Sequence, residues 1–226
     1  MGPMEGIRAC VFDAYGTLFD VHSAVGRLRP QIGAKADALS ELWRTRQTEY
    51  SWLRALMGRH TDFWQITGDA LDYALERTGV KPGPVREPLM RAYLKLDAYP
   101  EVPRVLRQLR EAGLKLAILS NGEPRMLAAA VTGAGLGDLL DAVLSVEEVG
   151  VFKPHPSVYQ LAVDRLGVRP DQISFQSSNA WDVSGAACFG LRVVWINRFD
   201  APAERLPGRP ERELSDLSGL PALVGV

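Results

Sequence analysis

Four short polar clusters hold most of the side chains in this chain that could carry out chemistry. Each comes soon after an apolar run, and together they supply carboxylates, a lysine, hydroxyl groups and amides. The clusters are DAYGT at 13–17, SNG at 120–122, FKP at 152–154 and SSNAWD at 177–182. Because carboxylates can act as nucleophiles or general bases, Asp13 and Asp182 are the leading candidates for catalysis.

Asp13 ends an apolar run and is the candidate nucleophile of the first cluster. Gly16 permits a tight turn after the acid and exposes backbone N–H groups to an anion. An Asp at a strand end is also a common helix cap or turn former, and the residue alone does not separate the two interpretations. Ser120 and Asn121 leave a similar choice. They precede a helix start that offers N–H groups to an anion, or they only cap that helix.

Lys153 would have a clear purpose beside Asp13. If Asp13 attacks a substrate that is itself a carboxylate, two negative charges about 4 Å apart repel by roughly 4 kcal/mol at an effective dielectric constant of about 20. A lysine between them offsets that repulsion. The alternative is a lysine that simply faces solvent.

The four clusters can meet only if the apolar runs before them form one sheet. Five runs have the pattern of buried strands, and helical patterns separate the later ones. The runs are at 7–12, 114–120, 141–146, 172–176 and 191–197, and the helices at 126–135, 157–167 and 182–190. This alternation predicts the α/β class, with a doubly wound, Rossmann-like parallel sheet. In such a sheet, the carboxyl ends of the strands lie at one edge, which brings the clusters together.

Residues 21–98 interrupt this alternation with helices alone. Apolar residues at spacings of three and four predict helices at 38–57, 62–79 and 84–99. We expect this block to cover the edge where parallel sheets bind ligands, as an all-helical cap domain inserted into an α/β core domain made of 1–20 and 99–226. From Asn197 onward, several prolines and arginines predict a surface wrap, with a short helix near 215–223.

Composition favours a small-molecule partner. The 226 residues are 46% hydrophobic and 23% charged, with a formal net charge of -1, as in an ordinary globular protein. No block of like charges suggests a surface for nucleic acid or an anionic membrane. Two cysteines, Cys10 and Cys188, make no disulfide framework, and the N-terminus has no export or anchoring pattern. We therefore expect a cytoplasmic protein.

The order DxxGT, SN, KP and a terminal acid resembles the haloacid dehalogenase superfamily, whose members use an aspartate as a covalent nucleophile. The stretches FDAYGTLFDVHS, LWRTRQTEYSWLR, LKLAILSNG, FKP and SSNAWD more closely resemble the L-2-haloacid dehalogenases, across core and cap. The resemblance implies hydrolysis of short-chain (S)-2-haloalkanoic acids to (R)-2-hydroxy acids through an ester on Asp13, with release of halide. It also implies a homodimer that needs no cofactor.

Tyr15 separates this interpretation from a phosphatase of the same superfamily. Phosphate-transferring members carry a second Asp two residues after the nucleophile, as a general acid, and bind Mg²⁺. This chain has Tyr15 there, and Asp182 is the only carboxylate of its fourth cluster. Mg²⁺ prefers several oxygen ligands, whereas a halide leaving group needs no proton, so we expect no metal. A Mg²⁺-dependent phosphatase and a non-catalytic binding protein are the alternatives.

The resemblance implies roles for the core side chains. Asp13 matches the nucleophile, Asp182 the acid that organises or activates water, and Lys153 the cation that balances both. The other matches are Thr17, which would orient Asp13; Ser120, for the substrate carboxylate; Ser177 and Asn179, for the water network; and Tyr159, which would contact Lys153 or that network. An ordinary tyrosine of a core helix is the alternative for Tyr159.

The cap is expected to contribute Arg44, which matches the arginine that receives the departing halide. Asn121 is a second candidate for that task. Tyr15, Phe63 and Trp181 would wall the pocket, and each could instead be ordinary core. Excluding water from such a pocket strengthens the attraction between a guanidinium and an anion.

Three residues depart from the family pattern. Thr45 and Thr48 stand where a glutamine and a leucine are expected, which could alter the alkyl chain or halogen that fits. Gln176 stands where a small apolar residue is usual. It is expected to place a polar amide beside the water-organising cluster.

Overall fold

The apolar runs form one parallel sheet in the computed structural model, which describes residues 2–226. Six strands run in the order β3-β2-β1-β4-β5-β6, and each neighbouring pair is parallel. Their bounds are β1 Ala9–Phe12, β2 Lys115–Ser120, β3 Ala142–Ser145, β4 Ile173–Ser177, β5 Arg192–Ile196 and β6 Arg212–Leu214. β1 is central and all of its residues are buried, so its carboxyl end is a natural place for a ligand site.

The five predicted strands are confirmed, but the sequence does not predict the edge strand β6. Its three residues, REL, include a single apolar side chain and none is fully buried, so no apolar run marks them. The predicted surface wrap after Asn197 is therefore interrupted by a strand. The helix predicted near 215–223 is present as a short turn at Leu217–Gly219 followed by α9 Leu220–Leu223.

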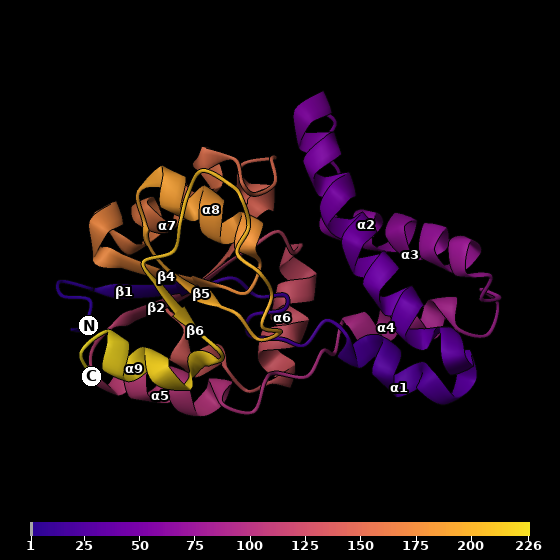
Figure 1. Ribbon diagram of the computed structural model, residues 1–226, viewed down its shortest axis with the longest axis horizontal. Helices are drawn as coiled ribbons and strands as arrows, with labels where there is room; N and C mark the ends of the chain where they lie inside the picture. Colours follow the sequence, from indigo (N-terminus) through magenta and orange to yellow (C-terminus); the bar gives the residue numbers. More distant parts are fainter. Residues whose placement is uncertain (1) are drawn as a thin grey trace.

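Helices cover both faces of the sheet, as the doubly wound prediction requires (Figure 1). α7 Pro156–Leu166 and α8 Ala180–Phe189 lie on one face, and α5 Val102–Glu111 and α9 lie on the other (Figure 1). α6 Pro124–Gly133 follows β2 and packs against β3. Among residues 2–226, no helix is both long enough and apolar enough to cross a membrane.

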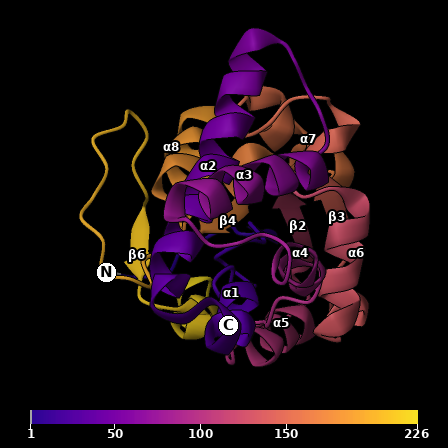
Figure 2. The same cartoon turned by 90° about the vertical axis from the view of Figure 1, so that its right-hand side faces the viewer.

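Four further helices stand beyond the carboxyl ends of the strands, in front of the sheet in Figure 2. They are α1 Ser23–Ile32, α2 Ala36–Met57, α3 Phe63–Thr78 and α4 Arg86–Tyr93. The sequence predicts the last three but not α1. That helix has Pro30 inside it, no acidic residue in its first turn and no side-chain cap, so it lacks the usual signals of a helix start.

The chain passes between the sheet and these helices twice, through residues 18–20 and 97–99, which we call the crossing segments. Backbone hydrogen bonds of 2.8 and 3.0 Å join the two, and Phe19 forms an antiparallel bridge with Ala98. The prediction of a helix as far as residue 99 is therefore wrong. α4 ends at Tyr93 because the residues that follow turn away to make this pairing.

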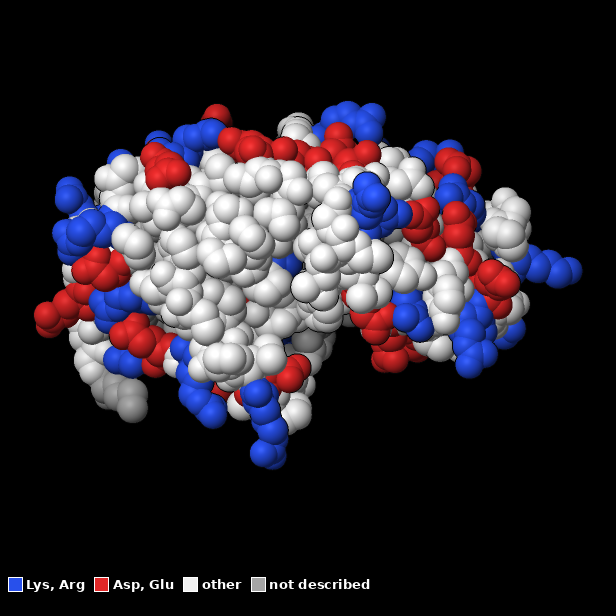
Figure 3. Space-filling view, turned by 90° about the horizontal axis from the view of Figure 1, so that it is seen from above, with Lys and Arg blue, Asp and Glu red and all other residues white. Residues whose placement is uncertain are grey.

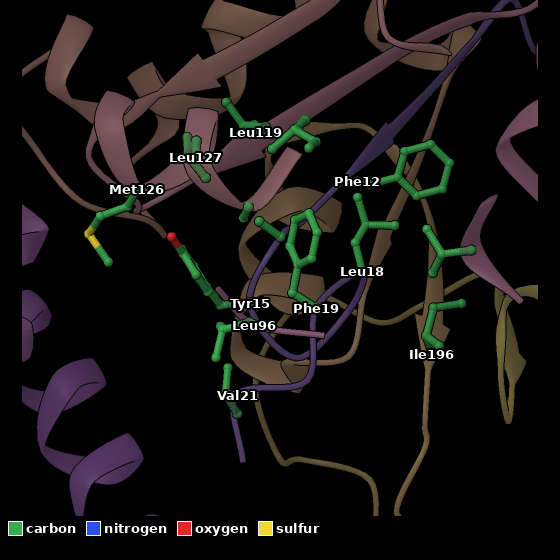
Figure 4. Close-up of a cluster of buried hydrophobic side chains, with 14 of the residues drawn as sticks. Phe12, Tyr15, Leu18, Phe19, Val21, Leu96, Leu119, Met126, Leu127 and Ile196 are labelled. Carbon is green, nitrogen blue, oxygen red and sulfur yellow. The ribbon is translucent and has the colours of Figure 1, made fainter. Parts of the chain in front are cut away.

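The turn after β1, residues 14–19, is fixed by packing and by its own backbone. Three consecutive N–H groups, from Thr17 to Phe19, donate to the carbonyl oxygen of Ala14. Figure 4 shows Phe19 on the side of Ile196 and the Tyr15 ring turned toward Met126, and all of these side chains are buried. The backbone that leads away from Asp13 is therefore held on both sides.

Candidate active site

Asp13 lies at the carboxyl end of the central strand, with its two carboxylate oxygens in different surroundings. Oδ2 accepts from the Thr17 hydroxyl at 3.2 Å and from Nδ2 of Asn179 at 2.8 Å. Gly16 has a φ of 90°, and a Cβ there would stand 3.1 Å from Oγ of Ser178, so a glycine suits both the turn and the close approach. The side chain is therefore oriented by neighbours on the turn after β1 and on the loop after β4.

Lys153 bridges the two acids, as the sequence predicts for a lysine at this edge. Its Nζ lies 3.1 Å from Oδ1 of Asp13 and 2.8 Å from Oδ2 of Asp182, and its side chain is 1% exposed. The alternative of a lysine that faces solvent is therefore wrong. Burial alone would lower the pKa of Lys153, but the attraction of both carboxylates outweighs burial and raises it. The ammonium stays charged between two acids.

Asp182 is fully buried, on the first turn of α8. Burial raises the pKa of its carboxyl group, and the charge of Lys153 opposes that effect only in part. The hydroxyl of Tyr159 donates to Oδ1 of Asp182 at 2.8 Å. Burial and the neighbouring carboxylate raise the pKa of Tyr159 well above its usual value, so this hydroxyl remains a hydrogen-bond donor. A carboxylate with a raised pKa is a better proton acceptor at neutral pH.

Tyr159 also has the surroundings of a core tyrosine. Its ring packs edge-on against Phe175 and is tilted against Phe189. The structural interpretation and the functional one therefore describe the same side chain, which is packed by its ring and bound to Asp182 by its hydroxyl. Ser177 is fully buried, and its hydroxyl accepts from the backbone N–H of Asn179 at 3.1 Å.

The loop after β2 approaches the acids from the opposite direction. Ser120 accepts from the backbone N–H of Gly122 at 3.0 Å, and Oδ1 of Asn121 accepts from the backbone N–H of Lys153 at 3.0 Å. Both side chains are buried or nearly so. Asn121 therefore helps to hold Lys153 in place, a contact that the sequence does not predict.

Arg44 reaches from α2 down to the end of the sheet. Its Nη2 donates to the carbonyl oxygen of Tyr15 at 3.3 Å and to Oδ1 of Asn179 at 3.2 Å. Since Asn179 also donates to Asp13, one asparagine links the guanidinium to the candidate nucleophile. The structure thus places the positive charge of the helical block beside the acids of the sheet.

Aromatic side chains surround this junction. The Tyr15 ring stacks on Phe63 at 6.0 Å and on Tyr93 at 5.6 Å, and Phe63 in turn lies 6.3 Å from Phe152, each measured between ring centres. Burial raises the pKa of the Tyr15 phenol well above its usual value, so the phenol is neutral. Within the described residues, its hydroxyl has no hydrogen-bond partner. The sequence does not single out Tyr93 and Phe152, because a buried aromatic on a helix or loop looks like ordinary core.

Trp181 lies apart from these rings. It is half-buried, packs edge-on against Trp52 of α2 at 5.2 Å, and lines a groove between α2 and the sheet domain that also reaches Lys153. It therefore shares a groove with Lys153 and does not belong to the ring cluster of Tyr15 and Phe63.

Two residues in or beside the fourth cluster make contacts that the sequence does not predict. Ser178, to which the sequence gives no separate role, donates its backbone N–H to the Thr17 hydroxyl at 2.8 Å. Gln176 does not lie beside the water-organising cluster, because alternate residues of a strand face opposite sides. Phe175 faces Lys153, while Gln176 shares the other face with Ser174, to whose hydroxyl it donates at 2.6 Å.

No group of three or more His, Cys, Asp or Glu side chains lies close enough to hold a metal ion in the part of the chain from residue 2 to 226. The two acids closest to a metal-like arrangement, Asp13 and Asp182, both contact the same ammonium. The donor set at this edge is therefore two carboxylates around a lysine.

Comparison with known proteins gives a consistent result over the whole chain. Residues 7–190 match the family model for haloacid dehalogenase-like hydrolases. The (S)-2-haloacid dehalogenase 1 of Pseudomonas sp. (strain CBS-3) is 50% identical over 222 residues, which cover 98% of each chain.

Solved structures agree. A dehalogenase crystallised with an intermediate complex has a TM-score of 0.96 and 47% identity, covering 98% of each chain. The L-2-haloacid dehalogenase from Xanthobacter autotrophicus with chloropropionic acid covalently bound has a TM-score of 0.89 and 41% identity, covering 96% of this chain and 98% of that one.

Proposed function

Because the chain belongs to the haloacid dehalogenase-like hydrolases, and among them to the (S)-2-haloacid dehalogenase family, we propose that it hydrolyses short-chain (S)-2-haloalkanoic acids to (R)-2-hydroxy acids and halide. The observation that carries this proposal is the bridge of Lys153 between Asp13 and Asp182, with Thr17 and Asn179 bound to the second oxygen of Asp13. This arrangement suits an acid that attacks an anionic substrate without help from a metal.

In the first step, a carboxylate oxygen of Asp13 attacks C2 of the substrate. The new C–O bond forms as the C–halogen bond breaks, and the halide leaves with the bonding electron pair, which inverts C2. Arg44 attracts the departing anion within the pocket walled by Tyr15 and Phe63. Ser120 and the nearby N–H groups bind the substrate carboxylate, and Lys153 offsets the repulsion between the two carboxylates.

In the second step, water attacks the carbonyl carbon of the Asp13 ester. Asp182 accepts a proton from that water, and its burial-raised pKa favours this role. The ester bond to Asp13 breaks, the product oxygen takes a proton, and the 2-hydroxy acid leaves. Tyr159, Ser177 and Asn179 hold the groups around the water in place. C2 is not attacked again, so the inversion of the first step is retained.

The phosphatase alternative has less support. A phosphate ester needs a proton on its leaving alkoxide, and the residue at the general-acid position is Tyr15, whose phenol is stacked and has a pKa that burial raises well above its usual value, which makes it a weak proton donor. A halide needs no proton.

The test is halide release from separate (R)- and (S)-2-chloropropionate, in EDTA and with Mg²⁺, alongside turnover of 4-nitrophenyl phosphate. We expect chloride only from the (S) acid, at equal rates in both buffers, and (R)-lactate as product. Asp13→Asn is the matched inactive variant, and it should fold normally. Mg²⁺-dependent phosphate release with no chloride would establish the phosphatase instead, and no turnover of either would favour a binding protein.

We also propose that residues 21–98 are a cap domain, inserted into a core domain of 1–20 and 99–226. The crossing segments support these boundaries, since they are the two places where the chain passes between sheet and helices. Arg44 supports the functional side, because it is a cap residue that contacts the core at Tyr15 and Asn179.

A homodimer is the proposed assembly. The far end of α2 exposes Leu53, Leu56 and Met57 at 52%, 85% and 63%. Leu56 also borders the apolar groove beside Trp181, and Figure 3 shows uncharged side chains over the middle of this face with charged ones around its margin. Sedimentation should give a dimer that Leu56→Lys converts to a monomer, whereas Phe199→Lys, at an exposed apolar site elsewhere, should remain dimeric. A monomeric parent protein would contradict the proposal.

Finally, we propose a cytoplasmic location. Cys10 and Cys188 are both free thiols, which suits a reducing compartment. Fractionation of cells that express the chain should find it with cytoplasmic markers, and its presence in the periplasmic or membrane fraction would contradict this.

A further inference from the structure

Arg198 has none of the roles described above, yet it contacts both the turn after Asp13 and the second crossing segment. It follows the end of β5 by two residues, and its side chain is 8% exposed. Its Nη2 donates to the carbonyl oxygen of Thr17 at 2.8 Å and to Oε1 of Glu101 at 2.6 Å. Its guanidinium lies 3.7 Å from the centre of the Tyr99 ring. One side chain from the segment after β5 therefore joins two others, the turn after β1 and the stretch from Tyr99 to Glu101.

These contacts use properties particular to arginine. A planar guanidinium can donate in its plane to a carbonyl and a carboxylate while its face lies on an aromatic ring, which an ammonium cannot do. Glu101 precedes the first turn of α5, where the helix dipole favours a carboxylate, so this acceptor is itself anchored. The hydrogen bond to the carbonyl oxygen of Thr17 places the turn after β1 beside the segment that follows β5.

Thr17 is the link from Arg198 to the reaction. Its carbonyl oxygen accepts from Arg198, and its hydroxyl donates to Oδ2 of Asp13. A shift of the Thr17 backbone would therefore change the orientation of the attacking carboxylate. The same turn continues directly into the first crossing segment. A movement of the helical block would therefore be transmitted through that segment to the turn.

We propose that Arg198 is a positioning residue. It fixes the turn after Asp13 to Tyr99 and Glu101, at the second crossing segment and the start of α5, and so keeps the nucleophile aligned. This inference rests on the proposed function. Ser120 and Arg44, the proposed partners of substrate carboxylate and halide, share no hydrogen bond with Arg198 among residues 2–226. We therefore expect Arg198 to affect the chemical step and not substrate binding.

The test compares Arg198→Met and Arg198→Lys with the parent protein. Arg192→Met is the matched control, because Arg192 begins the same strand and binds Glu211 through two hydrogen bonds of 2.9 and 3.0 Å, away from the acids. For Arg198→Met we expect kcat to fall about 10- to 100-fold with KM within about twofold, since small misplacements of a reacting group have effects of this size. Arg198→Lys should recover part of the loss, and Arg192→Met should match the parent.

Hydrogen exchange gives a readout that does not depend on activity. In Arg198→Met, the amides of residues 14–19 should exchange faster, while those of β1 stay protected. Unchanged exchange in this turn, or a rise in KM with kcat unchanged, would overturn the inference. If Arg198→Met does not fold, the same two measurements on Arg198→Lys decide. A parent protein that releases no halide would refute the proposed function, and the exchange result would still test whether Arg198 fixes the turn.

Discussion

Replacing Lys153 with methionine removes the ammonium that joins Asp13 and Asp182 but keeps a long apolar stem. With Nζ 3.1 and 2.8 Å from the two carboxylates, each attraction is worth about 5–6 kcal/mol at an effective dielectric constant of about 20. The net loss is smaller, because the variant no longer buries an ammonium and a carboxylate without its cation can take up a proton. Breaking a buried ion pair costs about 3–5 kcal/mol, and we expect the free energy of unfolding to fall by that amount near neutral pH.

The loss of stability should become smaller as the pH falls. Burial raises the pKa of Asp182 and Lys153 lowers it, so in the variant this pKa rises further above its unfolded value. A carboxyl group of this kind binds more protons in the folded state, so its stabilising contribution is complete below the unfolded pKa and is lost as the pH rises through the folded pKa. Lys153 of the parent protein stays charged over this range because its own pKa is raised.

Urea unfolding, followed by circular dichroism at about pH 5 and about pH 8, measures both effects. The difference between the parent and Lys153→Met should be larger at the higher pH. Lys81→Met, at an exposed position between α3 and α4, should change neither value. An equal loss at both pH values would refute the electrostatic argument and leave Lys153 as a packing residue.

Three other substitutions test separate parts of the site. Asp182→Asn should stop the second step, so intact mass after mixing with substrate should show the carboxyalkyl ester of Asp13, and an unmodified chain with full turnover would contradict this. Arg44→Ala should lower kcat more than it raises KM, whereas exposed Arg59→Ala should change neither. Gly122→Ala would put a Cβ 2.7 Å from the Tyr15 ring and 2.9 Å from Leu127. Urea unfolding should therefore show that the free energy of unfolding falls by about 1–3 kcal/mol. Gly137→Ala, where the Cβ would meet open space, should show no such loss.

The meeting of Asp13, Lys153 and Asp182 could be predicted because it follows from topology. Each of the three comes after a strand of one parallel sheet, and parallel strands end at one edge. The buried strands are marked by continuous apolar runs, so their existence can be predicted without a structure. Arg44 is different, since its amphipathic helix does not say which arginine faces the sheet, and only the family resemblance singles it out.

The errors also have physical causes. Pro30 and the lack of a cap hide α1, and the short, half-exposed β6 needs only one neighbouring strand. Gln176 was expected beside the acids because it is adjacent in sequence, but the two-residue period of a strand turns its amide to the opposite face. Asn121 accepts from the backbone of Lys153, and the backbone of Ser178 donates to the side chain of Thr17; both partners lie on distant segments, and no pattern in the sequence reports such contacts.

The contact of Arg44 with Tyr15 and Asn179 has a consequence for protein engineering. A chimera that joins this α/β sheet to the helices of another superfamily member would keep Asp13, Lys153 and Asp182 but lose the guanidinium beside them. To exchange specificity between such enzymes, the donor helices must therefore deliver a cation to the same carbonyl and amide oxygens. A grafted helical block must therefore make two contacts at once, one with the carbonyl oxygen of Tyr15 and one with the amide oxygen of Asn179. A library of grafted helices can be screened for these two contacts before any activity is measured.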